Sequence, residues 1–108
     1  MIERILSLAA AHPEGFTVSL PDLQPVTHGI VVAYLATQNS FDAAGLARCL
    51  EHAESHDGLV GGWLEEETGR YYFDSCRLFT DLQAAKAWGR EQRQLAIFDL
   101  TEGQVHPL

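Results

Sequence analysis

The stretch from Gly29 to Leu35 is apolar on both of the faces that alternate along an extended chain. A strand of this kind is stable where other parts of the protein cover both of its faces. A chain of 108 residues buries about two-thirds of its unfolded surface, which is enough to build one core without disulfides or metal. We therefore expect a single domain over residues 1–108, with residues 28–36 as a central strand.

Periodicity and turn signals predict three helices and five strands. The expected helices cover residues 2–11, a segment that Ser40 begins and Gly58 ends, and residues 81–92. The expected strands cover residues 16–19, 28–36, 59–64, 71–79 and 95–100, and a polar tail follows. The order is α-β-β-α-β-β-α-β with short links. It predicts an α+β fold in which three helices pack on one mainly antiparallel sheet of about five strands.

Charge and composition exclude several classes of protein. Seven Lys and Arg oppose fifteen Asp and Glu, so the net charge is −8, which argues against direct binding to nucleic acid or anionic membranes. No apolar run approaches the ~20 residues of a membrane span, and the first residues lack the pattern of a signal peptide. The two cysteines are too few for a disulfide scaffold. These features predict a cytoplasmic protein.

Five short segments occur together in this chain: Gly15–Val18 (GFTV), Thr37–Phe41 (TQNSF), Gly61–Trp63 (GGW), Gly69–Asp74 (GRYYFD) and Ala96–Leu100 (AIFDL). In this order they resemble a family of short uncharacterised proteins of bacteria, phages and other mobile elements. The resemblance implies an α+β fold. It implies no activity, no cofactor and no catalytic residue.

The polar segment Thr37, Gln38, Asn39 and Ser40 lies between the expected central strand and a helix. The N-terminus of a helix offers unpaired amides and the positive end of a dipole, so this segment is a candidate site for a small anionic ligand. The alternative is ordinary capping by Ser40, with Gln38 and Asn39 shaping the turn. The glycine motifs of nucleotide-binding loops are absent.

Cys49, His52 and His56 fall within about 60° of one another on the second expected helix, so they are candidates for a metal site. The acidic residue of a His-Glu-x-x-His motif is missing, because Ala53 follows His52. The simpler interpretation packs Cys49 at the edge of the core and leaves both histidines in solvent. We therefore predict no metal and no other cofactor.

Two aspartates, Asp74 and Asp99, are flanked by large apolar residues. Burial raises the pKa of a carboxyl group unless a cation such as Arg77, or a hydrogen bond, compensates. One interpretation is a small hydrolase-like enzyme that uses Asp74 or Asp99 with His28. The alternative is a structural, hydrogen-bonded role for each aspartate.

Two glycines precede Trp63, and glycine within a strand permits a bulge or the close approach of another group. The first interpretation of Trp63 is a core residue. The second makes Trp63, Tyr72 and Asp74 part of a pocket wall or an interface. Three short helices leave part of the apolar sheet uncovered, which predicts a homodimer.

The sequence as a whole favours a non-enzymatic binding or regulatory protein. Its acidic charge favours a basic protein partner, and the segment from Thr37 to Ser40 favours a small anionic ligand. The alternatives are the hydrolase-like enzyme that uses Asp74 and Asp99 with His28, and an oligomerising structural module.

Overall fold

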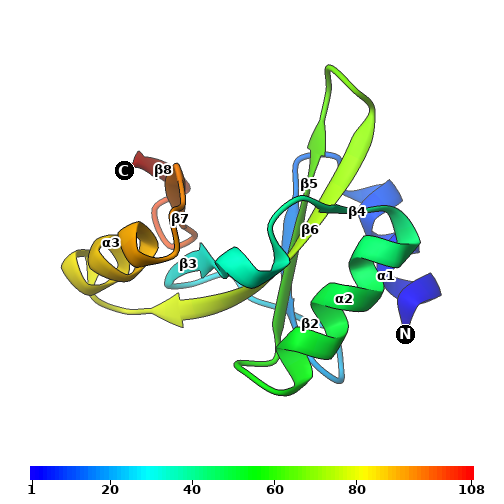
Figure 1. The fold of residues 1–108 in the computed structure, drawn as a ribbon, viewed down its shortest axis with the longest axis horizontal. Helices are drawn as coiled ribbons and strands as arrows, with labels where there is room; N and C mark the ends of the chain where they lie inside the picture. Colours follow the sequence, from blue (N-terminus) through cyan, green and yellow to red (C-terminus); the bar gives the residue numbers. More distant parts are fainter.

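One antiparallel sheet carries three helices in the computed structural model, which describes residues 1–108 (Figure 1). The helices are α1 (Ile2–Ala11), α2 (Asp42–Glu54) and α3 (Leu82–Glu91). The strands are β1 (Phe16–Ser19), β2 (Gln24–Pro25), β3 (Ile30–Ala33), β4 (Ser40–Phe41), β5 (Leu59–Glu65), β6 (Arg70–Phe79), β7 (Ala96–Asp99) and β8 (Gln104–Pro107). Their order across the sheet is β2-β1-β5-β6-β3-β7-β8, and β4 pairs with β6. None of the three helices is long and apolar enough to span a membrane.

The predicted α+β class, the three helices and the antiparallel sheet are confirmed, but the prediction of about five strands is wrong, because the sheet has eight. Strands β2 and β4 have two residues each, which is too short for any periodic signal. The expected polar tail contains β8, which pairs with β7 through its backbone. A turn with Gly103 at φ +65° connects these two strands.

Strand β6 is shared between two halves of the sheet. Its residues 70–76 pair with β5, and its residues 76–79 pair with β3, so that Cys76 lies between Leu59 and Ala33. Figure 1 shows β6 leaving the long hairpin with β5 and turning toward α3. The sheet therefore has one wing made by β2, β1 and β5, and a second wing made by β3, β7 and β8.

All three helices cover the same face of this sheet. Residues two apart on a strand share a face. On β6, Phe73 belongs to the core that α1 and α2 cover, while Phe79 contacts Trp88 of α3. The two helix-covered cores contain Ile5, Ala9, Leu46, Cys49, Leu50, Ala53, Val60 and Phe73 over the first wing, and Ile30, Val32, Ala85 and Ile97 over the second.

The opposite face carries no helix. A smaller cluster of Val31, Leu59 and Cys76 lies there, and Val26 and Leu100 pack against it. The central strand of the sequence prediction is thus buried on both faces, although it covers residues 30–33 and not residues 28–36. It is interrupted after Ala33 by a short 3-10 helix, η1 (Leu35–Thr37), before the chain rejoins β6 as β4.

Helix α2 begins close against the chain that precedes it, and Gly45 allows this. A Cβ atom at Gly45 would lie 2.6 Å from the carbonyl carbon of Ser40 and 3.0 Å from its Cα. We expect Gly45→Ala to lower the free energy of unfolding by about 1–3 kcal/mol, because the clash with backbone outweighs the better helix propensity of alanine. Urea unfolding measures the change, with Ala44→Gly as the control for propensity alone. A variant as stable as the wild type would contradict this packing.

Candidate functional site: a cavity on the helix-free face

A cavity of about 470 Å³ lies on the face of the sheet that carries no helix. Residues of β1 at one end of the sheet and of β7 near the other both line it. Since β5, β6 and β3 lie between these strands, the sheet must curve around the cavity. The lining includes Thr17 of β1, Gly61 of β5, Asp74 of β6, Ala33 of β3 and Phe98 of β7.

Asp74 lies on β6, in the wall of the cavity. Its Oδ1 accepts a hydrogen bond from the Cys76 thiol, with 3.2 Å between the two atoms. Burial raises the pKa of Asp74 to about 6, and the bond from Cys76 offsets only part of this effect. Burial, together with the nearby Asp74 carboxylate, raises the pKa of the Cys76 thiol well above its usual range.

The compensating cation that the sequence suggested for Asp74 is on the other face. Arg77 lies over the rings of Phe79 and Trp88, and its Nε is 3.9 Å from Asp57 Oδ2. Residues an odd number of positions apart on a strand point to opposite faces, and Asp74 and Arg77 are three positions apart. The sheet therefore separates their side chains. The Asp74 carboxyl group therefore has no cationic side chain beside it.

Gly61 lies directly opposite Asp74 in the β5–β6 register. A Cβ atom at Gly61 would lie 2.9 Å from Asp74 Oδ1, 3.3 Å from the carbonyl oxygen of Phe16 and 3.4 Å from the Cys76 sulfur. The glycine thus leaves the space in which the Asp74 carboxyl group and the Cys76 thiol meet.

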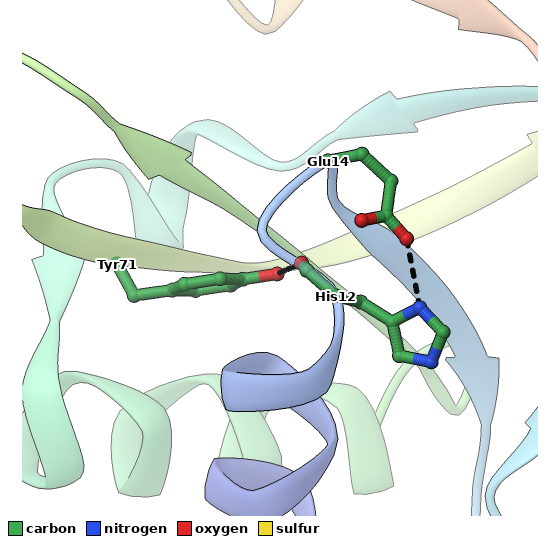
Figure 2. Close-up of polar contacts among 3 residues, drawn as sticks. All are labelled: His12, Glu14 and Tyr71. Atoms are coloured by element: carbon green, nitrogen blue, oxygen red, sulfur yellow. Dashed lines mark hydrogen bonds and ion pairs between the residues drawn. The ribbon is translucent and has the colours of Figure 1, made fainter.

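The turn between α1 and β1 forms part of the cavity lining through Glu14 and Gly15. Figure 2 shows how it is held: the Tyr71 hydroxyl donates to the carbonyl oxygen of His12 at 2.6 Å. The His12 ring nitrogen Nδ1 lies 2.8 Å from Glu14 Oε1, and this hydrogen bond lowers the pKa of Glu14. A side chain of β6 therefore fixes the position of the turn.

Trp63 and Tyr72 form a stacked pair, with ring centroids 5.3 Å apart and 19° between the ring planes. Trp63 lines the cavity and is 44% exposed, so its first interpretation as a core residue is wrong. Of the three candidates for a pocket wall or interface, Trp63 and Asp74 line the cavity, and Tyr72 packs against Trp63.

The segment proposed for a small anion has a structural role instead. The N-cap of α2 is Phe41, without a side-chain hydrogen bond, so Ser40 does not cap the helix. The Ser40 hydroxyl donates to the carbonyl oxygen of Thr37 and accepts from Arg48, both at 2.7 Å.

The Thr37 hydroxyl accepts from the amide of Ser75 at 3.0 Å, and so replaces a backbone partner of β6 where η1 interrupts the pairing. Gln38 and Asn39 are exposed, whereas Thr37 and Ser40 are buried. The four side chains therefore do not converge on one ligand position.

The candidate metal ligands also have other partners. Cys49 is buried in the core under α2, and burial raises its pKa to about 11. The rings of His52 and His56 stack with centroids 3.7 Å apart, and their Nδ1 atoms lie 2.8 Å from Ser75 Oγ and 2.7 Å from the carbonyl oxygen of His52, respectively. The structure groups no three His, Cys, Asp or Glu side chains as metal ligands.

The residues of the hydrolase-like alternative are dispersed. Asp99 follows the cavity residue Phe98 on β7, so it points to the helix-covered face, away from Asp74. Its Oδ1 accepts from the amide of Glu102. His28 is exposed, and its Nδ1 lies 3.0 Å from the hydroxyl of the adjacent Thr27.

Sequence reasoning missed Glu14, Gly15 and the β7 residues Ala96 and Phe98 as parts of this site. Their only signal was the short turn after α1 and the alternation along β7. The position of Gly61 was readable in principle, since a hairpin register with a fixed turn length places it opposite Asp74.

Comparisons of the chain with protein-family models, with curated proteins and with solved structures found no match. The resemblance to proteins of mobile elements therefore stays a prediction.

The raised pKa of Asp74 predicts that stability depends on pH. The folded protein holds this proton up to about pH 6 while the unfolded chain loses it near 3.8, so the contribution of Asp74 to stability falls as the pH rises between these values. Between about pH 4.5 and 7.5 the loss amounts to about 2 kcal/mol. We expect Asp74→Asn to gain that much stability relative to wild type between these two pH values. Urea unfolding at both pH values measures it.

The control for this experiment is Asp22→Asn, because Asp22 is exposed in the turn between β1 and β2. It should leave the pH dependence of stability as in the wild type. A stability difference between wild type and Asp74→Asn that is the same at both pH values would refute the burial of an ionisable carboxyl group.

The bond in Figure 2 predicts that Tyr71→Phe lowers the free energy of unfolding by about 1 kcal/mol, since the carbonyl oxygen of His12 loses its donor. The ring remains stacked on Phe16, at 6.0 Å between centroids. Tyr72→Phe, at the next position of β6, is the matched control and should change stability little. Equal effects of the two variants in urea unfolding would show that the hydroxyl of Tyr71 does not fix the turn.

Proposed function

We propose that this protein is a non-enzymatic binding protein that holds a small organic molecule in the cavity of its curved sheet. The observation that carries the proposal is the cavity itself, about 470 Å³ in volume, with the carboxyl group of Asp74 in a largely apolar lining. Ligand pockets typically have volumes of about 300–1,000 Å³ and combine apolar walls with a few polar groups that orient the ligand. This cavity has both properties.

The chemistry of the cavity supports binding over catalysis. A cysteine nucleophile reacts as the thiolate and needs a base or a cation that lowers its pKa. At Cys76 the opposite holds, because burial and the carboxylate of Asp74 raise its pKa and its hydrogen is donated to that carboxylate. The thiol therefore acts as a hydrogen-bond donor that orients Asp74.

The cavity replaces the segment Thr37–Ser40 as the proposed ligand site, because none of these four residues lines it. The carboxyl groups of Glu14 and Asp74 disfavour an anionic ligand in the cavity. The acidic net charge of −8 still supports a basic protein partner, and the paucity of cysteine still supports a cytoplasmic location. Both remain proposals.

The test uses the neutral, apolar fluorophore N-phenyl-1-naphthylamine, whose emission rises when it leaves water. We expect the wild type to bind this probe with saturable enhancement and Ala33→Phe to lose binding, because Ala33 lines the cavity and a phenyl group would fill it. Circular dichroism and thermal melting report whether the variant is folded.

The matched control is Ala47→Phe, which makes the same change on the exposed face of α2 and should leave probe binding intact. A folded Ala33→Phe variant that binds the probe as the wild type does would refute the cavity as the binding site. If Ala33→Phe does not fold, Thr17→Leu narrows the same cavity from β1 and is tested in the same way.

A homodimer is the second candidate, and one observation favours it. Four large apolar side chains that are 41–55% exposed, Trp63, Leu78, Phe98 and Val105, lie on strands of the sheet. The strand registers direct them to the helix-free face, where a second copy would cover them. Light scattering at micromolar concentration tests this proposal, and a monomer mass would refute it.

A further inference from the structure

The charges that line the cavity all have one sign. Glu14 and Asp74 contribute carboxyl groups, and no Lys, Arg or His is part of the lining. A concave site with one sign of charge and low-dielectric walls concentrates ligands of the opposite charge. The cavity therefore discriminates between ligands by charge as well as by shape.

Asp74 has one carboxylate oxygen to offer. Oδ1 accepts from the thiol of Cys76, while Oδ2 accepts no hydrogen bond from the protein. Only one buried side-chain N or O atom in the protein lacks a hydrogen-bond partner, and that atom is Nε2 of His106. Asp74 Oδ2 also lacks such a partner, so it is not fully buried and remains accessible from the cavity. An accessible carboxylate oxygen in a cavity wall accepts most strongly from a charged N–H donor.

The protein does not supply that donor. Arg77 lies within ion-pair distance of Asp57, and the histidines His12 and His106 lie within 4 Å of Glu14 and Asp99, but none of these side chains is paired with Asp74. A buried carboxylate without a counter-charge is costly, and a cation beside it removes that cost. A cationic ligand is thus the missing partner that the site is built to favour.

The rest of the cavity describes the remainder of the ligand. Val31, Phe98 and Leu100 provide an apolar wall, and the half-exposed indole of Trp63 lies in the lining. Apolar groups of a ligand pack on such a wall, and an indole face also attracts a cation.

We infer that the ligand of this cavity is an organic ammonium ion with an apolar body, whose N–H group donates to Oδ2 of Asp74. This inference rests on the proposed function and names its ligand class. A primary or secondary ammonium satisfies the site, whereas a quaternary one has no N–H to donate.

The titratable groups that face the ligand are Asp74 and Cys76 of β6 and Glu14 of the α1–β1 turn; β3 and β7 contribute none. The pKa of Cys76 is raised and that of Glu14 is lowered, so among the groups of the lining only Asp74 changes its charge within the neutral range, while His12 contacts Glu14 from outside the lining. Binding of an ammonium ion must therefore weaken as the pH falls through about 6.

The test compares three probes with the same phenylpropyl body and different charge: 3-phenylpropylammonium, 3-phenylpropan-1-ol and 3-phenylpropanoate. Each competes with N-phenyl-1-naphthylamine for the full-length protein at about pH 7.5 and at about pH 5. We expect the ammonium to bind about tenfold more tightly than the alcohol at the higher pH, and the carboxylate to bind most weakly. The preference for the ammonium should shrink at the lower pH.

Asp74→Asn should abolish the preference for the ammonium over the alcohol, because the amide keeps the shape of the side chain and loses its charge. Glu51→Gln is the matched control, since it removes one negative charge from the exposed side of α2 on the opposite face of the sheet. It should keep the preference. The pH comparison on the wild type tests the same point if Asp74→Asn fails to fold.

The outcomes distinguish failure of the ammonium inference from failure of the proposed ligand-binding function. If the naphthylamine binds and the alcohol displaces it as well as the ammonium does, or if the ammonium does not displace it, the inference is overturned and the proposed function stands. If the naphthylamine shows no saturable binding to the wild type, the proposed function fails as well.

Discussion

The change of partner along β6 determines the shape of the whole molecule. Residues 70–76 of this strand pair with β5 and residues 76–79 pair with β3, so two wings share one strand and meet at Cys76. Because three helices pack on one face of both wings, the other face is left to curve around open space. The alternation of side chains then decides the chemistry: Phe73 and Ser75 enter the helix-covered side, while Asp74 and Cys76 enter the cavity.

This arrangement places a destabilising group in the wall of the candidate site. Burial raises the pKa of Asp74 to about 6. The absence of a side chain at Gly61 leaves room for the Asp74 carboxyl group. Neither choice improves the fold, since an apolar residue at position 74 would pack without this cost. Departures from the best local choice concentrate at functional sites, and here two of them face each other across one pair of strands.

The sequence predicted the parts of the fold that depend on local pattern. The hairpin of β5 and β6 was predicted to within a residue or two, because alternation and an acidic, glycine-containing turn specify it locally. The segment after Ala33 was not predicted, because η1 interrupts the strand and the Thr37 hydroxyl takes the place of a backbone acceptor for Ser75. Strand β8 has four residues that are mostly exposed, so it carries no side-chain pattern to detect.

The candidate site was harder to predict than the fold because its lining residues come from segments that are far apart in the sequence. Thr17 and Phe98 line the same cavity although 81 positions separate them in the sequence, and no periodicity encodes such an approach. The sequence did mark Asp74 as unusual, since a carboxyl group between aromatic residues needs a partner. It suggested Arg77 as that partner, but an odd spacing on a strand sends the two side chains to opposite faces. The same alternation that deprives Asp74 of a protein cation leaves one of its oxygens open to a ligand.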